Sequence, residues 1–150
     1  MTETESVQAQ LRQLFSAQRL GVLASQNEGQ PHTSLVAFAA TADLRRLVFA
    51  TTRATRKYAN LKADARVALL VDNRSNREAD FHEAMAATAY GSAVELSGAE
   101  RQNGFELYVG KHPHLREFAA APNCALLAIA VQNYSVVDRF QHVIELPVPP

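Results

Sequence analysis

The sequence has little of the features that mark secreted, membrane-bound or nucleic-acid-binding proteins. It contains one cysteine, Cys124, so no disulfide can form within the chain. Its formal net charge is zero, whereas nucleic-acid-binding domains usually carry a basic excess. No apolar stretch reaches the roughly 20 residues of a membrane span, and the acidic first residues lack a signal-peptide pattern. We therefore expect a cytoplasmic protein with no nucleic-acid or membrane partner.

What remains is the composition of a globular protein. Of its 150 residues, 47% are hydrophobic and 20% charged, which is enough to bury a core without disulfides. The chain shows no repeat, low-complexity segment or linker, and we expect one domain over residues 1–150. Cys124 begins an apolar run that predicts a buried strand, so we interpret it as a core residue and not as a reactive thiol.

Two helices carry the signature of a helix start. Thr2 with Glu5, and Ser97 with Glu100, have the spacing of a capping box. The first box precedes an amphipathic pattern, in which apolar residues recur at helical spacing. Two further helices are expected, over residues 55–63 and 113–121.

Short apolar or alternating segments, separated by turn residues, predict seven strands. The segment 66–71 is apolar on both faces, which predicts a central strand. Because the strands cluster instead of alternating with helices, an antiparallel sheet is favoured over a doubly wound parallel one. We predict a mainly β fold, an antiparallel barrel of six to seven strands with flanking helices. The expected strands are 20–25, 32–39, 46–51, 66–71, 86–96, 124–131 and 134–146.

Three cations gather where a predicted strand gives way to a predicted helix, in Thr51-Thr52-Arg53-Ala54-Thr55-Arg56-Lys57. A helix N-terminus favours negative charge, so cations at this place suggest a bound anion. Backbone N–H groups, threonine hydroxyls and the Arg56–Lys57 pair would together form a phosphate cradle. Local physics alone leaves a second interpretation open, a solvated positive face of the helix.

Several short motifs follow one another in order along the chain. They are Leu20-Gly-Val-Leu-Ala-Ser25, Gly29-Gln-Pro-His-Thr-Ser34, Leu47-Val-Phe-Ala-Thr-Thr52, Thr55-Arg-Lys57, Asn60-Leu61 and Ala65-Arg-Val-Ala-Leu-Leu-Val71. This order resembles the pyridoxamine 5′-phosphate oxidase-like FMN-binding split barrels, over roughly residues 5–146. Residues 135–141 are similar to the last strand of short members of this superfamily. The resemblance implies a split barrel that binds FMN.

The resemblance also implies a homodimer with FMN in clefts between the subunits. It assigns Arg56 and Lys57 to the FMN phosphate, with the hydroxyls of Thr52 and Thr55 assisting. The residues that it places near the ring or ribityl chain are Ser34, Leu35, Val36 and Thr51, with Asn73 and Gln141 approaching the flavin from the same or the second subunit.

The expected ring site also has a physical basis in the second strand. Ser34, Val36 and Phe38 share one face there, which would offer the ring one polar handle and an apolar wall. True pyridoxamine-phosphate oxidases carry an arginine and a lysine where this chain has Ser34 and Ala39, so we do not expect oxidation of vitamin B6. His112 and His114 lack an evident third ligand, and we expect no metal.

These observations predict an FMN-dependent oxidoreductase that acts on a small molecule or a reduced nicotinamide. The sequence shows no convincing general acid or base, so the catalytic residues stay undefined. Three alternatives remain open: a non-catalytic flavin-binding or carrier protein, a haem-binding split barrel, and a deazaflavin-dependent enzyme with the same basic phosphate site.

Overall fold

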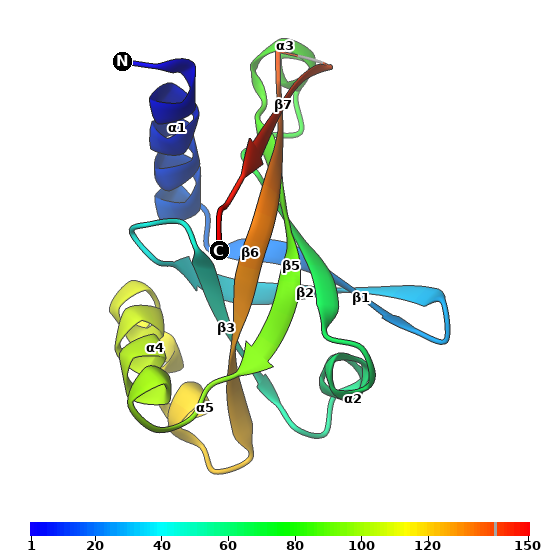
Figure 1. Cartoon of the computed structure of the whole chain (residues 1–150), viewed down its shortest axis with the longest axis vertical. Coiled ribbons are helices and arrows are strands. Elements are labelled where there is room, and N and C mark those ends of the chain that lie inside the picture. The colour runs from blue at the N-terminus through cyan, green and yellow to red at the C-terminus, as the bar shows by residue number, and fades with distance from the viewer. Residues whose placement is uncertain (140) are drawn as a thin grey trace.

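The computed structural model, which describes residues 1–139 and 141–150, consists of one antiparallel sheet with helices around it (Figure 1). Its strands are β1 (Leu20–Asn27), β2 (Gln30–Ala40), β3 (Arg46–Thr52), β4 (Arg66–Asp72), β5 (Ala86–Glu95), β6 (Cys124–Asp138) and β7 (His142–Pro147). Its helices are α1 (Glu3–Ala17), α2 (Arg56–Ala63), α3 (Asp80–Glu83), α4 (Gly98–Lys111), the 3-10 turn η1 (Pro113–Leu115) and α5 (Arg116–Ala120). The strand order is β3-β2-β1-β4-β5-β6-β7.

Pairing of β3 with β6 closes the first six strands of this order into a barrel, and β7 adds to the far edge of β6. The predicted mainly β fold with an antiparallel barrel is confirmed. β4 lies between β1 and β5, which confirms its predicted central position. β2 pairs with β3 only through Phe38, Ala39 and Ala40. Its earlier residues pair with β1 alone, so the two strands separate along most of β2.

Two hydrophobic clusters lie on either side of the sheet. The first fills the barrel, and the apolar face of α1, which includes Leu11 and Phe15, packs against it. The second lies between the outer faces of β3 and β6 and the helices α4 and α5. β3 and the first half of β6 are therefore covered on both faces, which explains their continuous apolar sequence. Cys124 is buried in the second cluster, as predicted.

Only one of the two predicted capping boxes forms. Glu5 N donates to Thr2 Oγ1 over 3.0 Å and Thr2 N donates to Glu5 Oε2 over 3.1 Å, which confirms the box at α1. The prediction at α4 is wrong, since the Ser97 side chain makes no capping bond. Glu100 instead accepts from Arg46 NH1 over 2.6 Å, because β3 brings a full positive charge close to its carboxylate.

The predicted division between the last two strands is also wrong. β6 continues as one strand of 15 residues through Gln132 and Asn133, because it exchanges β3 for β7 as its partner there and keeps β5 along its other edge. The chain reverses only after Asp138. Gln141, which we expected on the last strand, precedes β7 with φ 70°, and Arg139 has φ 43°, so both adopt the left-handed conformation of a turn.

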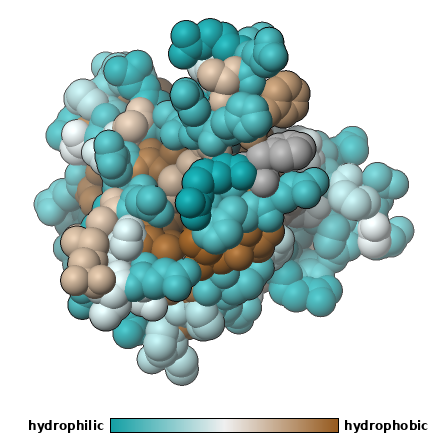
Figure 2. Space-filling model, turned by 90° about the horizontal axis from the view of Figure 1, so that it is seen from above, coloured by the Kyte–Doolittle hydropathy of each residue, from teal (hydrophilic) through white to brown (hydrophobic). Residues whose placement is uncertain are grey.

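The surface mixes polar and apolar side chains. Figure 2 looks down on the end of the molecule that carries α1 and α3, and it shows hydrophobic side chains in hollows framed by hydrophilic ones. On the outer face of the sheet, Leu35 is 66% exposed and Tyr90 is 47% exposed. Among the described residues, no helix is long and apolar enough to cross a membrane.

A close backbone approach at Gly91 provides a test of the barrel. The β5–β6 register shifts between Tyr90 and Gly91, and a Cβ at Gly91 would lie 2.1 Å from the Ala130 carbonyl oxygen. We expect Gly91→Ala to lower the free energy of unfolding by about 1–3 kcal/mol in urea denaturation. Gly110→Ala in α4 is the matched control, since a Cβ there meets nothing within 4 Å and should leave the free energy unchanged or raise it. Equal losses in both variants would contradict this packing.

Candidate functional site

Three side chains of the predicted phosphate segment converge where β3 meets α2. Thr51, on β3, is 1% exposed, and its hydroxyl oxygen lies 2.9 Å from that of Thr55. Lys57 Nζ donates to the same Thr51 hydroxyl over 3.4 Å. Thr55 is the N-cap of α2, because its Oγ1 accepts from the Tyr58 N–H. The strand, the cap and the helix thus place two hydroxyl groups beside one ammonium group.

The positive charge of Lys57 is incompletely compensated. Among the residues that the structure describes, no carboxylate lies within ion-pair distance of its Nζ. Partial burial lowers the pKa of Lys57, because removal from water disfavours the charged form. An anion beside the ammonium group would reverse this effect. The chemistry of these donors therefore fits a phosphate group.

Arg56 and Thr52 lie next to this group. Arg56 is the first residue of α2, is exposed, and makes no hydrogen bond or ion pair with any described side chain or backbone group outside its helix. A cation at this position opposes the helix dipole, which an anion would offset. Thr52 is half-buried, and its carbonyl oxygen accepts from Thr55 Oγ1 over 3.1 Å. Its hydroxyl makes no hydrogen bond to a described residue and remains open to a ligand.

Arg53, the third cation of the segment, has a different role. Its NH2 lies 2.8 Å from Glu95 Oε2, and its NH1 donates to the Pro122 carbonyl oxygen over 3.0 Å. Tyr58 donates its hydroxyl proton to the other oxygen of Glu95 over 2.6 Å. The Tyr58 hydrogen bond and the Arg53 ion pair lower the pKa of Glu95. Glu95 lies on β5, far along the chain, and no local sequence signal linked it to this segment.

Buried contacts hold α2 against the barrel. Asn60 is 3% exposed, and its Nδ2 donates to Ser25 Oγ on β1 over 3.2 Å. Leu61 is 4% exposed and belongs to the barrel core. Together with the Tyr58–Glu95 bond, these contacts fix the start of α2 beside the end of β3. The Asn60-Leu61 motif therefore positions the cluster and does not line it.

The predicted ring-contacting residues of β2 alternate between the two faces of the sheet. Val36 and Phe38 are 4% and 0% exposed and fill the barrel, so the predicted apolar wall is part of the core and is not available to a ligand. Leu35 points outward at 66% exposure. Ser34 Oγ is buried without a hydrogen-bond partner among the described residues. A ligand on this strand would meet Leu35, the backbone and that orphaned hydroxyl.

Asn73 and Gln141 lie away from this cluster within one chain. β4 runs from the α2 end of the barrel to Asn73, and its seven residues span about 20 Å. Asn73 Oδ1 accepts from Met85 N over 2.7 Å and closes the loop between β4 and β5. Gln141 lines a separate pocket of about 430 Å³ with Met85 and Val143. Their predicted approach to a flavin from a second subunit stays a prediction.

The histidines form no metal site among the described residues, where no group of three or more potential ligands occurs. His112 is 1% exposed, and its Nε2 lies 2.8 Å from the Phe38 carbonyl oxygen. Burial lowers its pKa, so the neutral imidazole acts as a core hydrogen-bonding group. His142 Nδ1 lies 2.6 Å from Asp138 Oδ1.

Lys57 provides a test of the site in the absence of any ligand. Because folding lowers its pKa, the unfolded chain binds more protons between the folded value and that of free lysine, and stability rises with pH in that interval. At neutral pH the charged form opposes folding. We expect Lys57→Met to raise the thermal unfolding midpoint of the cofactor-free protein at pH 7, with a smaller gain at pH 10.

Lys62→Met is the matched control, because Lys62 is exposed on the same helix, 4.0 Å from Glu95. It should leave the midpoint unchanged or lower it slightly. A lower midpoint for Lys57→Met than for the wild type at pH 7 would show that the ammonium stabilises the free fold, contrary to this account.

Comparison with known proteins identifies the family of this chain and solved structures with a similar fold. Residues 7–138 match the family model described as Pyridoxamine 5'-phosphate oxidase. No curated protein matches the chain. Among solved structures, a heme binding protein from Mycobacterium smegmatis is 16% identical, with a TM-score of 0.84 over 98% of this chain and 58% of that one. Campylobacter jejuni ChuZ is 12% identical, with a TM-score of 0.81 over 98% of this chain and 61% of that one. A FAD-binding protein from Mesorhizobium loti is 16% identical, with a TM-score of 0.68 over 85% and 91%.

At these identities the solved structures show a shared fold, and the chain spans less than two thirds of the first two. The family match is the stronger finding, because it extends from α1 to the end of β6 and includes all six strands of the closed barrel. This chain belongs to the pyridoxamine 5'-phosphate oxidase family.

Proposed function

We propose that the chain is an FMN-binding flavoprotein of the cytoplasm and that the β3–α2 junction holds the FMN phosphate. One observation carries the proposal: Lys57 places a partly buried ammonium beside the hydroxyls of Thr51 and Thr55, and no carboxylate of a described residue lies within ion-pair distance of it. Arg56 and the Thr52 hydroxyl add donors that no described residue uses. A phosphate would accept hydrogen bonds from the Lys57 ammonium, the Arg56 guanidinium and the Thr52 hydroxyl. The Thr51 and Thr55 hydroxyls, which bond to each other, position the ammonium beside it.

The edge of β2 is the proposed place for the ring. β2 pairs with β3 only from Phe38 onward, so no described strand pairs with this edge of β2 before that residue. Backbone groups of Ser34, Leu35 and Val36 are available to a flavin there, and the orphaned Ser34 hydroxyl gains a partner. Leu35 would cover one side of the ring and keep water from it. Bound FMN supplies one- and two-electron transfer chemistry, while the chain binds and orients it.

We further propose a homodimer, supported by the outer face of the sheet. Leu35 pairs with Val22, and Val22 pairs with Leu70, so three apolar side chains form a row across β2, β1 and β4. None of the three belongs to either hydrophobic cluster. A second copy on this face would bury the row. We propose that Asn73 and Gln141, which lie away from the phosphate cluster within one chain, approach the ring from this second copy.

We propose that the protein is an oxidoreductase acting on a small molecule or a reduced nicotinamide. Vitamin B6 oxidation is not proposed, because Ser34 and Ala39 replace the cations expected at those positions and Ala39 is 1% exposed. A flavin carrier without catalysis is the alternative. Haem binding is a second candidate, favoured by the name of the heme binding protein from Mycobacterium smegmatis, which has the same fold. His32, on β2 two residues before Ser34, is half-exposed and would offer an imidazole on the same strand.

The phosphate assignment predicts a large loss of affinity when its two cations are removed. Each lost charge-assisted hydrogen bond should cost about 1.5–3 kcal/mol, so Arg56→Ala with Lys57→Ala should weaken FMN binding at least about a hundredfold in a fluorescence titration. Lys62→Ala, on the same helix, should leave the affinity unchanged. Riboflavin, which lacks the phosphate, should bind the wild type and the double variant equally. An unchanged FMN affinity in the double variant would refute the assignment.

Catalysis predicts reduction of the bound flavin. We expect NADH or NADPH, mixed without oxygen with the FMN-loaded protein, to bleach the blue flavin absorption faster than it bleaches free FMN at the same concentration. Stopped-flow absorbance measures both rates. If neither NADH nor NADPH reduces the bound flavin faster than free FMN, a reduced nicotinamide is not the electron donor. If no small-molecule reductant reduces the bound flavin faster than free FMN, the protein is a carrier.

A further inference from the structure

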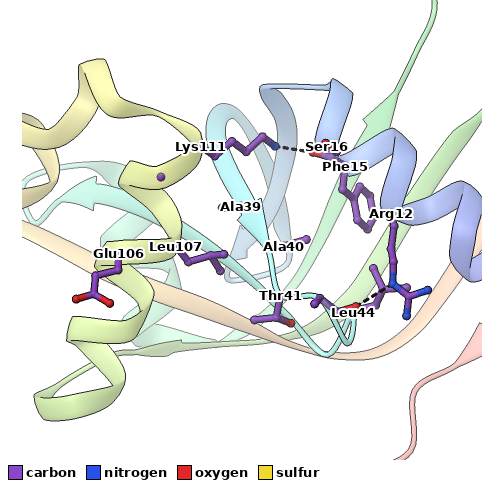
Figure 3. A pocket seen from close by; sticks show the side chains of 12 residues that line it. Arg12, Phe15, Ser16, Ala39, Ala40, Thr41, Leu44, Glu106, Leu107 and Lys111 are labelled. Carbon is purple, nitrogen blue, oxygen red and sulfur yellow. Dashed lines mark hydrogen bonds between the residues drawn. The ribbon is translucent and has the colours of Figure 1, made fainter.

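A pocket that is distinct from the one beside Gln141 lies at the opposite end of β3 from the cluster of Thr51, Thr55 and Lys57. It has a volume of about 570 Å³ and is formed by α1, α4 and the turn between β2 and β3 (Figure 3). β3 begins beside this turn and ends at Thr52, so its seven residues separate the two places by about 20 Å. The pocket volume is in the range of small-molecule sites, roughly 300–1,000 Å³. We refer to it as the α1–α4 pocket.

Small and apolar side chains line most of the α1–α4 pocket. Leu107 of α4 and Leu44 of the β2–β3 turn form two apolar walls, and Ala40 lies between them (Figure 3). Gly110 opens the α4 side, since a Cβ built on it would meet no atom within 4 Å. Glycine weakens a helix relative to alanine, so the space above Gly110 comes at a cost to α4. The pocket is therefore open where a larger helix-forming residue would fit.

Two cations lie on the α1 side of this pocket. Arg12 Nε donates to the Ala42 carbonyl oxygen over 2.9 Å, which orients the guanidinium and leaves its NH1 and NH2 without partners among the described residues. Lys111 reaches across from α4, as Figure 3 shows. Its Nζ donates to the carbonyl oxygens of Phe15 and Gln18 over 2.6 Å each.

Neither cation has a carboxylate partner in the part of the chain that the structure describes. Burial lowers the pKa of Lys111 to about 8, so it is still protonated at pH 7. Glu106, the acidic residue of the lining, accepts from Gln102 Nε2 along its own helix over 3.1 Å. The Arg12 guanidinium is thus free to attract an anion. The Lys111 ammonium is already held by two carbonyl oxygens of the α1 end and lies 3.9 Å from the centre of the Phe38 ring, so it adds positive potential without offering a free donor.

We propose that the α1–α4 pocket binds a small apolar carboxylate. The apolar part lies between Leu107 and Leu44, over Ala40, and the carboxylate accepts from the free NH1 and NH2 of Arg12. The planar guanidinium matches a carboxylate in a two-point contact, and the Lys111 ammonium adds positive potential. A neutral molecule of the same shape would gain the apolar contacts alone. The site is independent of the flavin proposal.

Cinnamate and cinnamyl alcohol test the proposal, because they share their apolar part and differ in charge. In two-dimensional NMR of the wild-type protein, we expect cinnamate to cause saturable amide shifts around Ala40, Leu107 and Gly110. The alcohol should bind there more weakly. Arg12→Gln should weaken cinnamate binding about tenfold or more and leave the alcohol unaffected. Absence of saturable shifts with cinnamate, as when a second copy fills the pocket, would overturn the proposal.

Gly110 supplies a variant that blocks the pocket without disturbing the core. Gly110→Leu should abolish binding of both probes while the thermal midpoint stays at or above that of the wild type. Gly110→Ala should keep cinnamate binding. The Arg56→Ala, Lys57→Ala double variant should also keep it, which separates this site from the flavin phosphate. Retained binding in Gly110→Leu, or cinnamate shifts centred on Thr51–Lys57, would place the ligand elsewhere and refute the proposal.

Discussion

Pairing between β3 and β6 is the constraint on which both sites depend. It covers the whole of β3, from Arg46 to Thr52, and closes the barrel. The barrel core packs against one face of β3, and α4 and α5 cover the other, so both faces of this strand are buried. Its end delivers Thr51 to the start of α2, and its beginning supports the turn beneath the α1–α4 pocket. The same closure draws β3 away from β2, which leaves the edge of β2 open beside Ser34.

At the β3–α2 junction, one cation is used in structural contacts and two cations are left for the proposed phosphate site. Arg53 forms an ion pair with Glu95. The second carboxylate oxygen of Glu95 accepts a hydrogen bond from Tyr58 of α2, so this ion pair helps to hold α2 in place. Lys57 is partly desolvated and Arg56 lies at the positive end of the helix, and neither pairs with a carboxylate of the described residues. A cluster of cations that opposes folding without a ligand, and whose donors gain acceptors from a bound anion, is typical of a ligand-binding site. The proposed FMN phosphate accounts for both costs.

The sequence predicted local structure well and long-range structure less well. The Thr2–Glu5 box, the helix over 55–63 and the central strand 66–71 follow from the chemistry of neighbouring residues, and all three formed. Glu100 does not form the predicted capping box and instead accepts a hydrogen bond from Arg46, 54 residues away in the sequence. The strand β6 passed through two polar residues because its partners change there.

The site residues also differ in whether they could be predicted from neighbours in the sequence or only from the tertiary structure. The hydroxyls and cations of residues 51–57 are close in sequence, and the structure brings Thr51, Thr55 and Lys57 together. The prediction that Val36 and Phe38 form an apolar wall for the flavin ring was wrong. Alternation along a strand shows which residues share a face, but it does not show whether that face lines the core. The α1–α4 pocket had no local signal, since it joins residues of α1, the β2–β3 turn and α4. Such sites require the tertiary structure.

FMN is the cofactor that we propose for this member of the pyridoxamine 5'-phosphate oxidase family. The most direct measurement is the visible spectrum of the protein as purified, followed by mass analysis of the released cofactor. We expect the near-ultraviolet and blue bands of an oxidised flavin and the mass of FMN. A Soret band with released haem, or a deazaflavin mass, would refute FMN as the cofactor.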